Sequence, residues 1–341
     1  MTEEESIVQD IKQLENHLFN VTDDTQFQSI ARKIFTFQYK LNPVYNRYCE
    51  FLGKTPYNCR DLKDIPFLPI DFYKKHKVLT DGTDYEMLFE SSGTTGMERS
   101  KHFLKRVDLY KKSFRKGYEL FYGKPEDYCV LALLPGYLEN KHSSLIHMAK
   151  GLMADSKCSE SGFYLNDLDK LAEKLIYLNK KRKKVLLLGV SFALLDMAEK
   201  FPMELKNTIV METGGMKGRR KEITREELHE ALKKGFGVNE IHSEYGMAEL
   251  LSQAYSKHDG IFQTPPWMKI FIRDAYDPYE VHKESEDNSV NGGINIVDLA
   301  NLYSCSFIET KDIGKLYPNG TFEVVGRLDY SDIRGCNLMV I

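Results

Sequence analysis

Apolar residues recur at two spacings along the chain, and the pattern changes near residues 85 and 265. In the first 50 residues they recur every three or four positions, which is the period of a helix that buries one face. One such stripe consists of Phe27, Ile30, Ile34 and Phe37. Three prolines between residues 56 and 69 then interrupt the pattern, so we expect ordered irregular chain there.

Between residues 85 and 264, short apolar runs alternate with amphipathic segments. The apolar runs predict strands at 128–134, 185–189, 208–211 and 240–243. The amphipathic segments predict helices at 107–122, 143–153, 167–179 and 224–234. Thr224 and Glu227 have the spacing of a capping box at the start of the last helix. Strands that alternate with helices indicate an α/β fold with a layered, mostly parallel sheet.

After residue 265 the pattern becomes one of short strands and tight turns. Strands are expected at 269–273, 293–297, 304–308 and 322–325, and Asn-Gly pairs between them are typical of hairpin turns. We therefore expect three parts. A helical N-terminal segment, 1–84, packs on an α/β core, 85–264, and a C-terminal barrel-like β subdomain, 265–341, contains a hinge-like Gly-Arg-x-Asp motif.

Composition narrows the class of protein without indicating its chemistry. The 341 residues carry 47 Lys and Arg against 50 Asp and Glu, and this balance argues against broad, charge-driven nucleic-acid binding. No apolar run approaches the roughly 20 residues of a membrane span, and the acidic N-terminus MTEEESIVQD is not a signal peptide. The six cysteines form no Cys-x-x-Cys pair, so we expect free thiols in the reducing cytoplasm.

The sharpest local motif is Ser-Ser-Gly-Thr-Thr-Gly at residues 91–96, followed by Arg99, Lys101 and Lys105. Such a loop can turn several backbone N–H groups and hydroxyls toward one anion, and a nearby cation can balance a phosphate charge. It is not the P-loop of Walker NTPases. The alternative is an ordinary Ser/Gly turn between two strands.

Three weaker motifs follow in order along the chain. Gly214 and Gly215 come directly after a predicted strand, where open α/β sheets bind ligands. In Tyr-Gly-Met-Ala-Glu, Tyr245 offers a flat face for a nucleobase and Glu249 a carboxylate for Mg²⁺. Asp312 could accept hydrogen bonds from ribose hydroxyls, and Arg327 could donate to ribose or phosphate. Taken singly, each is also compatible with a simple turn or a surface salt bridge.

Together, these motifs resemble those of the adenylate-forming superfamily of acyl ligases. The closer resemblance is to the acyl-protein synthetase (LuxE) family. It is carried by SSGTTG, LLPGYLENKHSSLIHM, VMETGGMKGRRKEITREEL, EYGMAELLSQAY and GRLDYSDIRGCNL. The resemblance implies the large-domain fold of this superfamily, without its small C-terminal lid. It also implies that ATP, with Mg²⁺, activates a fatty or other carboxylic acid as acyl-AMP, and that a thiol then receives the acyl group.

The resemblance also assigns roles to residues. The ATP phosphates would be held by Ser91, Ser92, Thr94, Thr95 and Gly96. Gly214, Gly215 and Tyr245 would frame the adenine. Asp312 and Arg327 would hold the ribose, and Glu249 would bind Mg²⁺.

The acyl acceptor of the family corresponds to Cys336, flanked here by Gly335 and Arg334. The alternative is that Cys336 is a small apolar residue entering a strand-like tail. His142 would contact the acyl group or the phosphates. A reductase or an acyl carrier would be the partner protein.

The chain departs from the superfamily pattern at three points. Glu98-Arg99 replaces the usual Pro-Lys after the phosphate loop, and an Arg fork is not equivalent to a Lys point charge. Ala248 replaces a Thr whose hydroxyl would reach the α-phosphate, so water or Ser252 would have to substitute. By this resemblance we also expect no lid and no lid Lys, so Arg99, Lys101, Lys217 or a partner would supply that charge.

Two further functions therefore stay open. One is a phenylacetate-type aryl- or acyl-CoA ligase, which would deliver the acyl group to CoA. The other is a catalytically degenerate protein that binds nucleotide or acyl groups as a scaffold, which Ala248 and the missing Lys favour.

Overall fold

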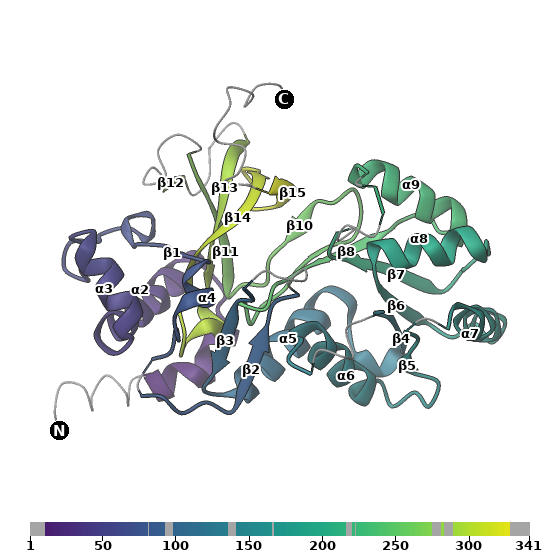
Figure 1. Ribbon diagram of the computed structural model, residues 1–341, viewed down its shortest axis with the longest axis horizontal. Coiled ribbons are helices and arrows are strands. Elements are labelled where there is room, and N and C mark those ends of the chain that lie inside the picture. Colours follow the sequence, from purple (N-terminus) through teal and green to yellow (C-terminus); the bar gives the residue numbers. More distant parts are fainter. Residues whose placement is uncertain are drawn as a thin grey trace.

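The computed structural model describes residues 11–80, 82–92, 98–135, 141–165, 167–215, 220–221, 223–274, 281–282 and 289–327. A long mixed sheet runs through the molecule, with helices on both sides of its parallel part (Figure 1). Its thirteen described strands follow the order β12-β11-β13-β14-β15-β10-β9-β8-β7-β6-β4-β5, with β1 attached to β14. The predicted α/β class is confirmed.

The N-terminal segment forms the predicted helices, α2 (Asp24–Leu41) and α3 (Pro43–Phe51), followed by the short helix α4 (Phe72–Lys75). The Asp23 carboxylate caps α2, and the Asn42 side chain caps α3. The buried ring of Phe35 meets that of Phe307 edge to face, 5.9 Å apart between centroids. A two-residue strand, β1 (Leu68–Pro69), joins the main sheet. This segment thus packs against the C-terminal strands.

The parallel half of the sheet contains β4 (Cys129–Leu133), β5 (Gly162–Phe163), β6 (Val185–Val190), β7 (Thr208–Thr213) and β8 (His242–Tyr245). Helix α5 (Val107–Tyr122) precedes these strands. The helices between them are α6 (Ser144–Ser156), α7 (Leu168–Lys180), α8 (Ser191–Lys200) and α9 (Arg225–Phe236). Helices α8 and α9 lie on one side of the strands and α5 and α6 on the other (Figure 1). The predicted capping box of α9 is present.

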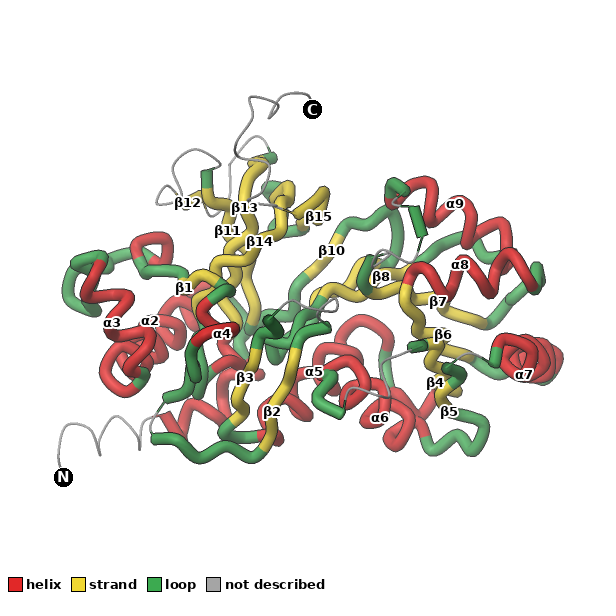
Figure 2. Tube along the Cα trace, in the orientation of Figure 1, coloured by secondary structure: helices red, strands yellow, loops and turns green. Residues whose placement is uncertain are grey.

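The C-terminal half is antiparallel, as predicted, and continues the same sheet (Figure 2). Its strands are β9 (Ala254–Ser256), β10 (Phe262–Gln263), β11 (Met268–Arg273), β12 (Val281–His282), β13 (Val290–Asp298), β14 (Phe307–Leu316) and β15 (Phe322–Arg327). Outside this sheet, β2 (Met87–Glu90) and β3 (Lys101–Leu104) form a separate antiparallel pair.

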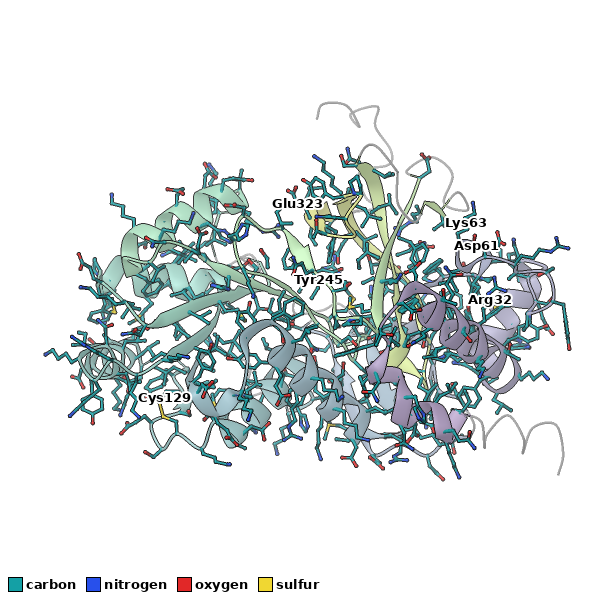
Figure 3. All side chains as sticks on the ribbon, turned by 180° about the vertical axis from the view of Figure 1, so that it is seen from behind. Arg32, Asp61, Lys63, Cys129, Tyr245 and Glu323 are labelled. Atoms are coloured by element: carbon teal, nitrogen blue, oxygen red, sulfur yellow. A yellow bond between two sulfur atoms is a disulfide. The ribbon has the colours of Figure 1, made fainter. Side chains whose placement is uncertain are left out.

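The prediction of free thiols throughout is wrong for two cysteines. Cys129, labelled in Figure 3, is disulfide-bonded to Cys158, with 5.4 Å between their Cα atoms. Cys129 begins β4, and Cys158 lies between α6 and β5, the parallel neighbour of β4. This pairing therefore follows from the tertiary fold and leaves no sequence signature. Cys336 lies outside the described residues.

Across the described residues, none of the helices combines the length and the apolar character needed to cross a bilayer.

Candidate active site

The β2–β3 hairpin presents the predicted phosphate loop at its tip. Glu90 and Lys101 are the last paired residues before the loop. Beyond them, the Ser91 N–H donates to the Ser100 carbonyl (3.1 Å), and the Ser100 N–H donates to Ser91 Oγ (3.0 Å). Ser92 is exposed. Both serines thus lie at the base of the loop, whereas Thr94, Thr95 and Gly96 lie outside the described residues.

Two other predicted residues lie beside this hairpin. Arg99 is exposed, and its Nη1 is 3.8 Å from Oε2 of Glu90. His142, also exposed, has its Nδ1 3.2 Å from the Leu88 carbonyl. Its own carbonyl accepts a hydrogen bond from the Glu90 N–H at 2.9 Å. The structure therefore brings Arg99 and His142 to β2, next to the predicted phosphate loop.

Tyr245 on β8 comes together with Asp312 and Arg327, which lie on the consecutive strands β14 and β15. The Tyr245 hydroxyl donates to Oδ2 of Asp312 at 2.7 Å, and Tyr245 is labelled in Figure 3. Asp312 lies opposite Arg327 in the sheet, with Arg327 Nε 3.9 Å from its Oδ1. The Tyr245 ring packs edge-on against Phe262 and Phe322. Burial raises the pKa of Asp312, although the Tyr245 hydroxyl and the Arg327 charge oppose the shift.

Glu249 is the buried carboxylate of this region, only 4% exposed. Burial raises its pKa, and a hydrogen bond from the Ser100 hydroxyl partly offsets this effect. The Arg327 and Asp312 charges also act on it. Ser100 therefore links the hairpin to Glu249, and Glu249 lies within electrostatic reach of the Asp312–Arg327 pair.

The donor set around Glu249 suits Mg²⁺ held jointly with a substrate. In the described part of the chain, no three His, Cys, Asp or Glu side chains are grouped so as to hold a metal ion. Mg²⁺ usually takes one or two carboxylates and fills its remaining positions with phosphate oxygens and water. A single carboxylate beside a predicted phosphate loop fits that requirement.

The Gly-Gly segment lies at the carboxyl end of β7, next to Tyr245 at the end of β8. Gly214 has φ +68°, a conformation that favours glycine, and its carbonyl accepts a hydrogen bond from the Ser191 hydroxyl. A side chain at Gly215 would meet no atom within 4 Å. Open space beside Gly215 thus lies next to the end of β8, where Tyr245 is located.

Sequence reasoning missed three buried polar residues just before these glycines and Tyr245. Thr213 donates to Oε2 of Glu244 at 2.5 Å, and Ser191 lies 2.9 Å from Oε2 of Glu212. Burial raises the pKa of Glu244 to about 7, and the Glu212 carboxylate adds to the shift. Burial also acts to raise the pKa of Glu212, but hydrogen bonds from His229 and Ser243 outweigh it, so this pKa is lowered. In the sequence, the signal for these residues is an acidic residue, Glu212, near the end of the apolar strand β7.

Ser252 does not substitute for the hydroxyl that Ala248 lacks. It is fully buried, and its Oγ donates to Oδ1 of Asp298 at 2.6 Å. The same oxygen is 3.0 Å from Trp267 Nε1 and 2.9 Å from Ser113 Oγ. Ser252 is therefore committed to a buried polar network, so of the two alternatives for the missing hydroxyl, Ser252 is wrong and water stays a prediction.

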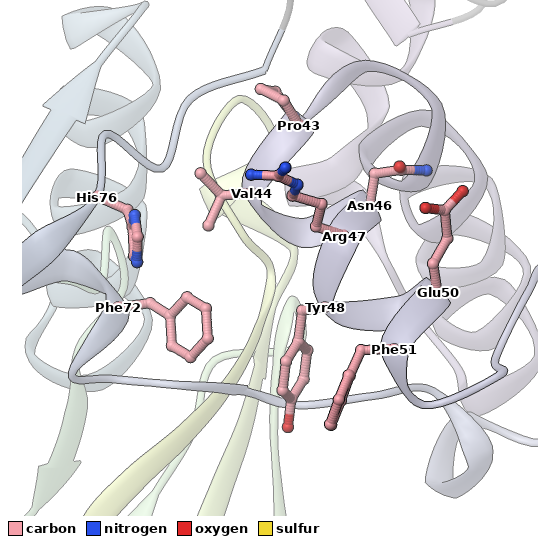
Figure 4. A pocket seen from close by; sticks show the side chains of 9 residues that line it. All are labelled: Pro43, Val44, Asn46, Arg47, Tyr48, Glu50, Phe51, Phe72 and His76. Carbon is pink, nitrogen blue, oxygen red and sulfur yellow. The ribbon is translucent and has the colours of Figure 1, made fainter.

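A separate cavity of about 740 Å³ lies between α3 and α4 (Figure 4). Tyr48, Phe51 and Phe72 give it an aromatic wall, and Arg47 and His76 add polar edges. None of the predicted site residues lines it, so it is distinct from the candidate active site.

The fold is that of the adenylate-forming enzymes. A long-chain-fatty-acid-CoA ligase from Archaeoglobus fulgidus superimposes with a TM-score of 0.50 and 14% identity, over 72% of this chain and 52% of that one. The O-succinylbenzoate coenzyme A synthetase of Bacillus subtilis gives a TM-score of 0.48 and 17% identity, over 74% of this chain and 66% of that one. The luciferase-like enzyme of the mealworm Zophobas morio gives a TM-score of 0.48 and 16% identity, over 74% of this chain and 59% of that one.

The chain therefore spans between about half and two thirds of the length of these three proteins. No similar sequence was found among curated proteins. The sequence model of the acyl-protein synthetase family, LuxE, matches residues 20–341. The chain belongs to this family.

Proposed function

We propose that this protein uses ATP to activate a carboxylic acid, of the fatty-acid class, and passes the acyl group to a thiol. In the first step a carboxylate oxygen attacks the α-phosphorus of ATP, so that acyl-AMP forms and pyrophosphate leaves. In the second step a thiolate attacks the acyl carbon, a thioester forms and AMP leaves. The supporting observation is the convergence of Ser100–Glu249 and Tyr245–Asp312 beside the tip of the β2–β3 hairpin.

The hairpin tip would bind the phosphates through Ser91, Ser92, Thr94, Thr95 and Gly96. Hydroxyls and backbone N–H groups in such a loop are donors fixed in advance of the reaction, which stabilises the charge that builds on the transferring group. Arg99, at the base of the loop, would add positive charge, and His142, which is held beside β2 at Leu88, would contact phosphate or acyl groups.

The adenosine would lie across the ends of β7 and β8. Gly214 and Gly215 allow a close approach of the backbone, and the Tyr245 ring offers an aromatic face to the adenine. Asp312 accepts one bond from Tyr245, and a carboxylate has further lone pairs for ribose hydroxyls. Arg327, about three quarters exposed, can reach the ribose from the neighbouring strand. Mg²⁺ held by Glu249 would neutralise phosphate charge.

Cys336 is proposed as the thiol that receives the acyl group. A neighbouring Arg334 would favour its thiolate, which is the nucleophilic form of cysteine. A reductase or an acyl-carrier protein would then take the thioester.

A degenerate, nucleotide-binding scaffold is the second candidate, because Ala248 offers no hydroxyl and Ser252 is engaged elsewhere. Loss of one such donor slows comparable reactions by about 10²–10³-fold.

Pyrophosphate exchange and intact mass separate these functions. The protein is incubated with ATP, Mg²⁺ and a panel of fatty and aromatic acids. Exchange with a fatty acid, together with a hydroxylamine-labile acyl adduct that Cys336→Ala abolishes, is the expected result. Cys59→Ala is the control, since the Cys59 thiol is buried against the Asp64 carbonyl. Pyrophosphate exchange that yields a CoA thioester and no acyl adduct on the protein would indicate a CoA ligase. ATP binding without pyrophosphate exchange would indicate the nucleotide-binding scaffold. An adduct that persists in Cys336→Ala contradicts the acceptor assignment.

A further inference from the structure

His102 lies on β3, in the interior of the molecule, and contacts the segment that carries Glu249. The residue is 1% exposed. Its Nδ1 is 2.9 Å from the carbonyl oxygen of Ala248, and its Nε2 is 2.8 Å from Oγ of Ser304. The ring also meets the Tyr73 ring edge to face, 5.4 Å apart between centroids. The imidazole is therefore held from three sides.

The contact with Ala248 defines the tautomer of the imidazole, and burial, which lowers the pKa of His102 to about 4, keeps the ring neutral. A carbonyl oxygen only accepts hydrogen bonds, so the proton must be on Nδ1 for the contact with Ala248 to form. Nε2 then accepts a hydrogen bond from the Ser304 hydroxyl. His102 is thus a neutral donor to the backbone of residue 248, directly before Glu249.

The same strand contacts the next residue as well. Ser100 directly precedes β3, and its side chain is buried like that of His102, as expected for positions two apart along extended chain. Ser100 donates to the Glu249 carboxylate, and His102 donates to the Ala248 carbonyl. Two consecutive residues are therefore attached to the strand that leaves the predicted phosphate loop.

Other contacts hold the far end of this segment. Asn301 donates to the Glu249 carbonyl at 2.7 Å, and Asp298 accepts from the N–H groups of Leu251 and Ser252. Both come from the C-terminal part of the chain. His102 is thus the contact that ties the backbone directly before Glu249 to the hairpin.

We propose that His102 is a positioning residue for acid activation, which holds the Ala248 carbonyl and so fixes the Glu249 carboxylate relative to the β2–β3 hairpin. This proposal rests on the proposed function. Because residue 248 has no polar side chain, its backbone carbonyl is the group available for this attachment.

Three variants test the role of the Nδ1 donor. In His102→Asn, the amide NH₂ takes roughly the place of Nδ1 and can still donate to Ala248. In His102→Gln, the amide is displaced toward the place of Nε2 and loses that bond. Ser304→Ala removes the other partner of the imidazole and leaves the Nδ1 bond in place, so it is the matched control.

Two measurements are made on each variant of the full chain. The first is pyrophosphate exchange as a function of Mg²⁺ concentration. The second is the rise in Tm caused by ATP with Mg²⁺, compared with the rise caused by ATP with EDTA. This second readout needs no turnover.

In His102→Gln, the exchange rate should fall about 10–100-fold, as is usual when a residue that orients a metal ligand is lost. Half-saturation should need more Mg²⁺, and the Tm increment specific to Mg²⁺ should shrink. His102→Asn should restore most of the Mg²⁺ response. Ser304→Ala should lower Tm and leave the Mg²⁺ response unchanged.

The proposal is overturned if activity in all three variants simply follows the loss of Tm, or if His102→Gln keeps the wild-type Mg²⁺ response. If the wild type shows no pyrophosphate exchange with any acid of the panel, the proposed function fails. The Mg²⁺-specific Tm increment then still decides the role of His102. A wild type that lacks both responses overturns both proposals.

Discussion

Replacing Glu244 with Gln should make the protein more stable above neutral pH. Glu244 is 7% exposed, and burial raises its pKa from a usual 4.5 to about 7. Because the folded-state pKa is above the unfolded one, the stabilisation from the protonated carboxyl is complete below about pH 4.5. It is lost as the pH rises through about 7. Each pKa unit corresponds to about 1.4 kcal/mol, so the loss reaches about 3 kcal/mol.

The Gln variant carries no charge to desolvate, and its amide oxygen can still accept the hydrogen bond from Thr213. Urea unfolding of both proteins between pH 5 and 8 gives the difference in the free energy of unfolding at each pH. This difference should grow in favour of Glu244→Gln by about 2–3 kcal/mol over that range. Taking the difference removes the contribution of groups that titrate alike in both proteins.

Glu126→Gln is the control, because the pKa of Glu126 is shifted in the opposite direction from that of Glu244. Glu126 is exposed, and its hydrogen bond with Lys157 lowers its pKa, so its stabilisation is present above the usual carboxyl pKa. Its replacement should therefore bring no gain in stability at high pH. A difference for Glu244→Gln that is flat with pH, or that falls toward pH 8, would refute the assignment of a protonated, buried Glu244.

Three further changes probe other parts of the structure. Tyr245→Phe removes the hydroxyl that donates to the partly buried Asp312, so it should cost about 1–3 kcal/mol in urea unfolding and weaken ATP binding in calorimetry; unchanged values for both would contradict the pairing. Reducing the Cys129–Cys158 disulfide should lower the unfolding free energy by about 2–4 kcal/mol, and a thiol titration of the unreduced, unfolded chain should find two fewer thiols than after reduction; equal counts would rule the bond out. Thr224→Ala removes the cap of α9 and should cost about 1 kcal/mol, with Thr224→Ser near wild type as the control.

Local patterns predicted the elements well where packing and sequence agree. The helix predicted at 107–122 is α5 with the same bounds, because its apolar stripe is regular and Gly123, at φ +80°, ends it. The strand predicted at 208–211 continues through Thr213. Glu212 and Thr213 are typical of a loop by composition, and their hydrogen bonds to Ser191 and Glu244 make them compatible with a buried strand.

The candidate site depended on information of another kind. Tyr245 and Asp312 are far apart in sequence, and only the order of motifs indicated that they belong to one site. No motif marks His102, whose proposed role is based on contacts with residues 248 and 304. The Cys129–Cys158 pair was missed because strand order in a parallel sheet, rather than cysteine spacing, brings the two together.

The parallel pairing of β1 with β14 also has a consequence for synthesis on the ribosome. Leu68 pairs with Ile308, and the aromatic side chains of Phe35 and Tyr45 pack against Phe307, near the other end of the chain. At usual rates of translation, residue 307 follows these residues after on the order of ten to fifty seconds. During that interval the N-terminal helices lack the surface that buries their aromatic face. We therefore expect the nascent chain to need chaperone protection until β14 emerges.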